Sequence, residues 1–190
     1  MKNVTIIGAG ALGSHVVQFL RGEAKLRVID FDRIEAKNVL AQFHGKSHIG
    51  KSKVEALKQT MNFLWNVKVD TIPHKLVQNN ADALLGGWDL IIDTLDNGEA
   101  RRIVQAYVRA HNTPCLHGAL AADGAFGRVI WDAQFVIDEE DSQGAPTCEG
   151  GEHLPYIGIV SAYLARAAQV FLRHGKKIGF SISPTNVIQV

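Results

Sequence analysis

The sequence predicts an α/β fold with a doubly wound, mostly parallel sheet and helices on both faces. Three observations support this prediction: apolar strand-like runs alternate with helical patterns, a glycine-rich turn follows the first run, and an acidic residue closes the second. The 190 residues are the size of one domain, so we expect a single domain over residues 1–190. Apolar residues make up 46% of the chain, enough for an ordinary globular core.

The elements follow from the spacing of apolar side chains. Residues 4–7 predict the first strand, and residues 12–20 predict a helix that Gly22 ends. Residues 26–29 predict the second strand, whereas residues 31–50 predict an irregular segment that wraps a ligand. The other predicted elements are strands at residues 67–72, 90–92, 114–117 and 126–131, helices at residues 52–64, 97–107 and 156–172, and a weak terminal strand or strand pair at residues 178–190.

Local signals mark three of these helices. The run Ser-Lys-Val-Glu at residues 52–55 predicts a capping box at a helix start. Asn97 is expected to cap the helix that follows it. Pro155 opens the last helix and Gly175 closes it, and because this helix is apolar nearly all round we expect it to be buried.

The glycine-rich turn is the most informative segment of the chain. Gly8 allows the tight turn, Gly10 lets the backbone approach a phosphate, and Gly13 lets the helix pack close to the strand. The helix N-terminus then offers free N–H groups to an anion. Asp30 ends the second strand, where a carboxylate meets a ribose hydroxyl in such folds. These features together predict a Rossmann-like site for an adenine nucleotide.

Three further segments narrow this prediction to a family. They are residues 28–42, residues 50–55 and residues 90–97, and together and in this order they resemble the ThiF/MoeB family. That family shares its fold with the adenylation domains of ubiquitin-activating enzymes. The resemblance runs from Val4 to about Leu172, and the segment around Cys148 resembles the cysteine-bearing loop of the family.

The resemblance implies ATP-dependent activation of a carboxylate as an acyl-adenylate. The substrate it implies is the C-terminus of a ubiquitin-like or sulfur-carrier protein, or a small carboxylic acid. Lys53 would contact phosphates in catalysis, and Asp96 would hold Mg²⁺. Cys148 is interpreted either as a nucleophile that accepts the activated acyl group or as an ordinary loop residue. The implied nucleotide-binding residues are Gly8, Gly10, Gly13, Asp30, Asp32, Asn38, Gln42 and Lys53.

Two alternatives to this function stay open, and a departure from the family pattern supports one of them. The family usually carries an arginine just before Gln42, and this chain has Ala41 there. Loss of a cation beside a transferring phosphate favours a catalytically weak binding subunit of a heteromeric activating enzyme. An NAD(P)-dependent oxidoreductase is the other alternative, which explains the glycine turn but gives no role to Lys53 or Asp96.

Several side chains that could take part in catalysis or metal binding are better interpreted as structural. Asp93 is expected to be structural, and His117 is better interpreted as a satisfied core histidine than as a site residue. His44 and His48 lie in irregular chain, so we do not expect them to form a metal pair. The tryptophans are expected to be core residues.

The expected cofactors are ATP and Mg²⁺, and composition bounds the setting. A net charge of +1 predicts attraction neither to nucleic acid nor to a membrane surface. We expect no uninterrupted apolar run long enough to span a bilayer. Two cysteines are too few for a disulfide framework, so a cytoplasmic location is expected. A homodimer is expected because the family usually pairs and because Phe43 and the tryptophans would leave apolar surface to cover.

Overall fold

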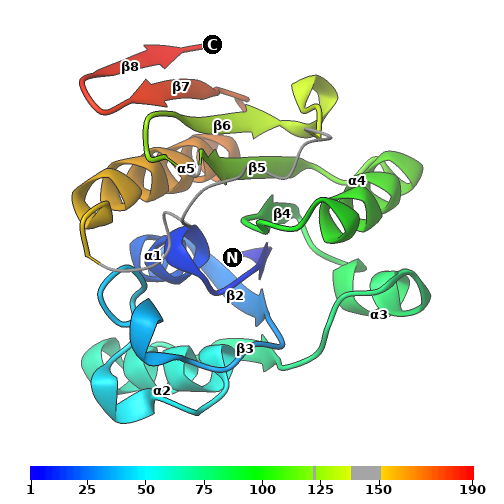
Figure 1. The fold of residues 1–190 in the computed structure, drawn as a ribbon. Helices are drawn as coiled ribbons and strands as arrows, with labels where there is room; N and C mark the ends of the chain where they lie inside the picture. Colours follow the sequence, from blue (N-terminus) through cyan, green and yellow to red (C-terminus); the bar gives the residue numbers. More distant parts are fainter. Residues whose placement is uncertain (122, 138–150) are drawn as a thin grey trace.

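The computed structural model describes residues 1–121, 123–137 and 151–190, and Figure 1 shows its fold. One sheet holds eight strands in the order β3-β2-β1-β4-β5-β6-β7-β8. The strands from β3 to β5 pair in parallel, and β6, β7 and β8 extend the sheet antiparallel beyond β5. The predicted fold, with its extra C-terminal strands, is therefore confirmed. The strands are β1 (Lys2–Ile7), β2 (Ala24–Ile29), β3 (Val69–Ile72), β4 (Leu90–Asp93), β5 (Cys115–Leu120), β6 (Gly127–Trp131), β7 (Phe180–Ser183) and β8 (Asn186–Gln189).

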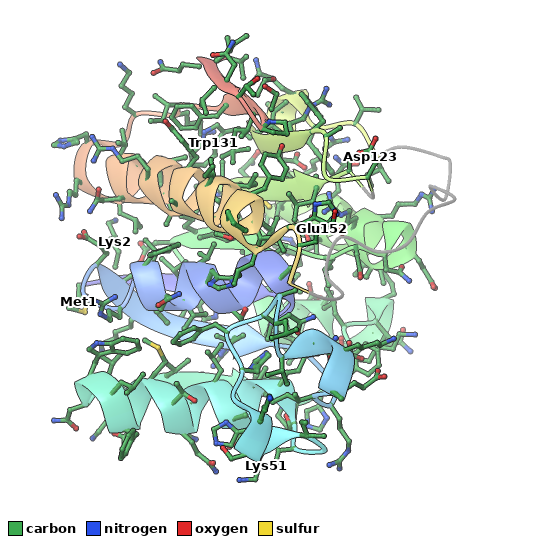
Figure 2. All side chains as sticks on the ribbon, turned by 60° about the vertical axis from the view of Figure 1, so that its left-hand side comes forward. Met1, Lys2, Lys51, Asp123, Trp131 and Glu152 are labelled. Carbon is green, nitrogen blue, oxygen red and sulfur yellow. The ribbon has the colours of Figure 1, made fainter. Side chains whose placement is uncertain are left out.

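Helices cover both faces of the sheet. Helices α5, α1 and α2 lie side by side on one face (Figure 2), and α3 and α4 lie on the other (Figure 1). Two clusters of buried apolar side chains correspond to these two faces. The helices are α1 (Ala11–Phe19), α2 (Lys53–Trp65), α3 (Ala81–Leu85), α4 (Gly98–His111) and α5 (Leu154–His174).

The central strands are apolar at successive positions because both of their faces are covered. In β1, Val4 and Ile6 belong to the cluster beneath α1 and α5, whereas Ile7 belongs to the cluster beneath α3 and α4. In β4, Ile92 and Ile91 divide between the two clusters in the same way. This explains why short unbroken apolar runs predicted these strands correctly.

The signals at the helix ends were partly correct. Asn97 caps α4 as predicted, since its side-chain oxygen accepts a hydrogen bond from the Ala100 N–H at 3.1 Å. The predicted capping box at α2 is wrong, because Ser52 makes no capping hydrogen bond with its side chain. Glu55 instead accepts a hydrogen bond from Thr71 on β3. The Glu55 side chain, which the local pattern assigned to the helix cap, is thus used in a tertiary contact instead.

Helix α5 is the core helix of one face. By length and by a mean hydropathy of 1.2 it is long and apolar enough to cross a membrane, a test that the buried core helix of a globular protein also passes. Here the helix packs on the sheet through small residues. A Cβ atom on Gly127 would lie 2.6 Å from a methyl of Val160, and one on Gly118 would lie 2.5 Å from a methyl of Leu164. Glycine at these two strand positions therefore lets α5 approach β5 and β6.

Candidate nucleotide-binding site

A cleft of about 1260 Å³ opens at the carboxyl ends of β1, β2, β4 and β5. This is the edge where open parallel sheets bind ligands. Figure 2 shows Met1 and Lys2 at the opposite end of the molecule from Asp123, which follows the carboxyl end of β5. The cleft brings together most of the predicted site residues, namely Gly8, Gly10, Asp30, Asp32, Asn38, Gln42, Lys53 and Asp96.

Glycine occurs at each of the three turn positions for a different physical reason. Gly8 has φ +96°, and a Cβ atom there would lie 2.9 Å from the Thr94 hydroxyl oxygen. A Cβ atom on Gly13 would overlap the carbonyl oxygen of Gly8, so α1 packs against the turn only with glycine there. A Cβ atom on Gly10 would meet nothing within 4 Å. The fold therefore requires Gly8 and Gly13, whereas Gly10 leaves backbone open to the cleft, as a phosphate site needs.

Asp30 holds the glycine turn as well as facing the cleft. Its Oδ2 accepts a hydrogen bond from the Ala9 N–H at 2.6 Å, and its Oδ1 accepts one from the Asp32 N–H at 2.7 Å. Burial raises the pKa of Asp30 above its usual value, while the charge of Lys53 and these two donors act in the opposite direction. Each carboxylate oxygen can accept a second hydrogen bond, so the predicted ribose contact is compatible with both backbone bonds.

Lys53 is a buried cation at the first residue of α2. Its Nζ donates to Oδ2 of Asp32 at 2.9 Å, and its backbone N–H donates to the carbonyl oxygen of Asp32 at 2.9 Å. A helix N-terminus disfavours a positive charge, and Asp32 offsets that cost. An ammonium has three donors, and in the described part of the chain this one uses a single donor. Two N–H groups are therefore left for an anion in the cleft.

Asn38 and Gln42 are buried amides that line the cleft. The side-chain oxygen of Asn38 accepts a hydrogen bond from the Glu35 N–H at 2.9 Å, which closes a short 3₁₀ turn. The side-chain oxygen of Gln42 has no partner among the described residues. Buried polar atoms without partners are rare in folded proteins, so a ligand or water is the natural partner. Because this oxygen is an acceptor, that partner must bring an O–H or N–H group.

Asp96 lies in the turn between β4 and α4, exposed and facing the cleft. The helix cap is Asn97, so Asp96 is not used for capping. The described ranges contain no group of three His, Cys, Asp or Glu side chains that would hold a metal ion. Mg²⁺ commonly binds through one or two carboxylates with phosphate oxygens and water, which suits a single free carboxylate beside a nucleotide. The metal role of Asp96 stays a prediction.

A buried charge cluster supports this turn from behind. His117 is completely buried, with Nδ1 2.7 Å from Oδ2 of Asp93 and Nε2 3.1 Å from Oδ1 of Asp132. Each ring nitrogen of His117 therefore lies within hydrogen-bond distance of one carboxylate oxygen. Oδ1 of Asp93 accepts a hydrogen bond from the Leu95 N–H at 2.9 Å. The structural interpretation of Asp93 and the core interpretation of His117 are therefore confirmed, and the cluster holds the turn next to Asp96.

Arg101 completes this support, a role that sequence reasoning did not assign. Its guanidinium donates to the carbonyl oxygen of Leu95 at 2.7 Å and to that of Gly118 at 2.9 Å, joining α4 to the turn after β4 and to β5. The nearby Cys115 thiol lies 3.5 Å from Nε2 of His117. Burial first, and the neighbouring carboxylates second, raise the pKa of this thiol well above its usual value, so it is not a nucleophile.

His44 is a second residue whose position the sequence did not reveal. Its Nε2 lies 2.9 Å from the carbonyl oxygen of Ala9, so it supports the glycine turn. Burial lowers the pKa of His44 to about 4, and the ring is neutral at neutral pH. His15 makes a matching contact, with Nε2 3.3 Å from the carbonyl oxygen of Ala41. Cys148 lies outside the described residues, so its role stays a prediction.

The eight-stranded sheet with helices on both faces defines a Rossmann-like α/β domain. The ThiF family model matches residues 1–178, and the chain belongs to that family. This confirms the family to which the sequence motifs pointed.

Several curated proteins are similar to this chain. The adenylyltransferase and sulfurtransferase UBA4 of Lodderomyces elongisporus is 29% identical over 176 residues, covering 86% of this chain and 39% of UBA4. The molybdopterin-synthase adenylyltransferase of Salmonella typhimurium is 26% identical over 186 residues, covering 90% of this chain and 73% of that protein. The chain thus spans about two fifths of the length of UBA4.

Solved structures show the same fold. The E. coli MccB chain crystallised with MccA matches with a TM-score of 0.81 at 17% identity, covering all of this chain and 63% of MccB. At this identity the likeness concerns the fold alone.

Proposed function

We propose that this chain is an ATP-dependent adenylyltransferase that activates a carboxylate. The observation that carries the proposal is the position of Lys53, a buried cation with donors to spare, in the same cleft as the glycine turn and Asp96. The ThiF family assignment favours ATP over the hydride-transfer alternative. Several relatives, including the sulfur carrier protein adenylyltransferase of Thermus thermophilus, carry this activity in their names.

The chemistry needs little covalent help from the protein. A carboxylate oxygen attacks the α-phosphorus of ATP, a new P–O bond forms, and the bond to the β-phosphate oxygen breaks to release pyrophosphate. Catalysis of this kind rests on positioning and on cations near the dispersing negative charge. Lys53 would bind phosphate oxygens, and Asn38 and Gln42 would orient the nucleotide. Asp96 would hold Mg²⁺, which would neutralise phosphate charge.

The proposed substrate is the C-terminus of a ubiquitin-like or sulfur-carrier protein, with a small carboxylic acid as the other class. The names of two relatives support the protein substrate: the SAMP-activating enzyme E1 of Haloferax volcanii, 29% identical, and the Thermus thermophilus enzyme, 31% identical. Cys148 would act after adenylation, when its thiolate attacks the acyl-adenylate to give a thioester and release AMP. Cys148→Ala should then spare adenylation and block the transfer.

A catalytically weak binding subunit is the second candidate. Ala41 favours it, because this residue is fully buried in the apolar core and brings no cation to the cleft. ATP–pyrophosphate exchange separates the two candidates, since a binding subunit would bind ATP without supporting exchange.

We also propose a cytoplasmic homodimer. The apolar surface expected from Phe43 and the tryptophans is largely covered within the chain, since Phe43 stacks on Trp65 at 6.1 Å between ring centroids and Trp131 is buried. Helix α2 instead exposes Phe63 and Leu64. Light scattering coupled to size-exclusion chromatography tests the proposal, and a monomer at micromolar concentration would contradict it.

The function is tested by calorimetry with ATP–Mg²⁺ and with NAD⁺, followed by exchange assays. We expect ATP binding, and exchange when a peptide ending in glycine or a small carboxylic acid is added. Lys53→Met should lower the exchange rate by about 10²-fold or more, the scale for loss of one positioned transition-state contact. Lys58→Met, on the same helix but exposed, is the matched control and should leave the rate unchanged. Binding of NAD⁺ in place of ATP would refute the proposal.

A further inference from the structure

The cleft extends beyond the residues that would hold the nucleotide. Small-molecule sites typically measure about 300–1000 Å³, and this cleft measures about 1260 Å³. Most of the proposed nucleotide contacts lie on the side of β1, β2 and α2. On the other side the cleft continues past the carboxyl end of β5. We name this part the β5–β6 arm, lined by residues 118–121, Phe126, Arg128 and residues 135–137.

Arg128 projects into this arm because of the strand alternation of β6. Gly127 and Val129 lie toward α5, since a Cβ atom on Gly127 would contact Val160 and Val129 belongs to the apolar cluster beneath α5. Successive side chains of a strand point to opposite faces, so Arg128 faces the cleft side. Its partner across the β5–β6 ladder is Ala119, whose small side chain leaves room for the guanidinium.

Arg128 is a half-buried cation without a counter-charge among the described residues. Its guanidinium carbon lies 5.5 Å from the ring centroid of Phe126, and in the part of the chain that the structure describes it has neither a hydrogen bond nor an ion pair. Two other arginines nearby are engaged: Arg101 with backbone carbonyl oxygens and Arg109 with Asp132 at 2.9 Å. Arg102 lines the cleft at the border of residues 135–137, and the rest of the lining of the arm besides Arg128 is small or apolar.

We propose that Arg128 binds a carboxylate of the acyl substrate in the β5–β6 arm; this inference rests on the proposed function. A guanidinium matches a carboxylate with two parallel hydrogen bonds, and a half-buried pair is weakly screened by solvent. The carboxylate belongs either to the peptide C-terminus or to an acidic side chain close to it. In both cases Arg128 offsets the repulsion that an anionic substrate meets beside a triphosphate.

Three fluorescent pentapeptides that end in glycylglycine distinguish the two sources. The first has a free C-terminal carboxylate and no acidic side chain, the second has a C-terminal amide and a glutamate three residues from the end, and the third has an amide and no acid. Binding is followed by fluorescence anisotropy on the full chain, with and without the non-hydrolysable analogue AMPCPP. We expect Arg128→Gln to weaken binding of one charged peptide about tenfold or more, which corresponds to about 1.4 kcal/mol.

The controls separate this site from the rest of the proposal. Arg128→Lys should retain part of the affinity, and Arg166→Gln, which removes an exposed charge on α5, should change nothing. Equal binding of each peptide by wild type and Arg128→Gln would overturn the inference, as would the absence of any peptide binding to wild type. If calorimetry finds no binding of AMPCPP while Arg128→Gln still weakens peptide binding, the proposed function fails and the carboxylate site stands.

Discussion

Replacement of His117 by phenylalanine tests the physical account of the buried charge cluster. In the wild type, Nδ1 of His117 lies 2.7 Å from Oδ2 of Asp93, Nε2 lies 3.1 Å from Oδ1 of Asp132, and the ring stacks on Phe135 with a centroid separation of 4.0 Å. Phenylalanine keeps a ring for stacking but removes both ring nitrogens that contact the carboxylates. His117→Phe therefore leaves two carboxylates without their shared partner.

The expected loss of unfolding free energy depends on which partners each carboxylate keeps in the variant. Removing one partner of a buried ion pair costs about 3–5 kcal/mol. Asp93 keeps the Leu95 N–H and a distant Arg101 at 3.9 Å, while Asp132 is partly exposed and keeps Arg109. We therefore expect the lower end, about 3 kcal/mol of unfolding free energy. For a chain of this length that lowers Tm by roughly 6–12 °C.

Urea denaturation followed by circular dichroism measures this loss. The double variant His117→Phe/Asp93→Asn removes the stranded charge, and it should be more stable than His117→Phe alone. His174→Phe, an exposed position at the end of α5, is the control and should stay within about 0.5 kcal/mol of wild type. A loss below about 1 kcal/mol for His117→Phe, or no recovery in the double variant, would refute the reasoning.

Three further predictions address the turn and the cleft. Burial lowers the pKa of His44 to about 4, below its value of 6.5 in the unfolded chain, so the unfolded state takes up the proton first as pH falls. Wild type should lose about 2 kcal/mol of stability from this group between pH 7 and pH 5, and His44→Gln should lose that much less over the same range in denaturation curves. Gly13→Ala should cost about 1–3 kcal/mol or more, because its Cβ would overlap the carbonyl oxygen of Gly8. Gly10→Ala should keep wild-type stability but weaken ATP binding in calorimetry; equal stability of these two glycine variants would contradict the steric argument. Asp96→Ala should abolish Mg²⁺-dependent exchange while the circular dichroism spectrum stays unchanged, and unchanged turnover would remove the metal assignment.

Sequence signals for turns and helix ends were reliable where residues within one short segment determine the local structure. The glycine turn, the Asn97 cap and the Pro155 and Gly175 boundaries of α5 depend on neighbours within a few residues, and the structure has all of them. The capping box at Ser52 failed because Glu55 pairs with a residue from another element. Helix α3 was missed, since its five residues are too few to display a helical period.

The order of residues along the chain determined the family, the doubly wound sheet and the glycine turn with Asp30, because each leaves a contiguous pattern of apolar runs, turn residues and spacing. Tertiary structure alone decided the pairing of Lys53 with Asp32, the burial of His117 between two carboxylates and the placement of Arg128 opposite Ala119. Those contacts join elements far apart in sequence. They form only when the folded sheet brings the partners together, so no contiguous sequence pattern reveals their burial or their charge balance.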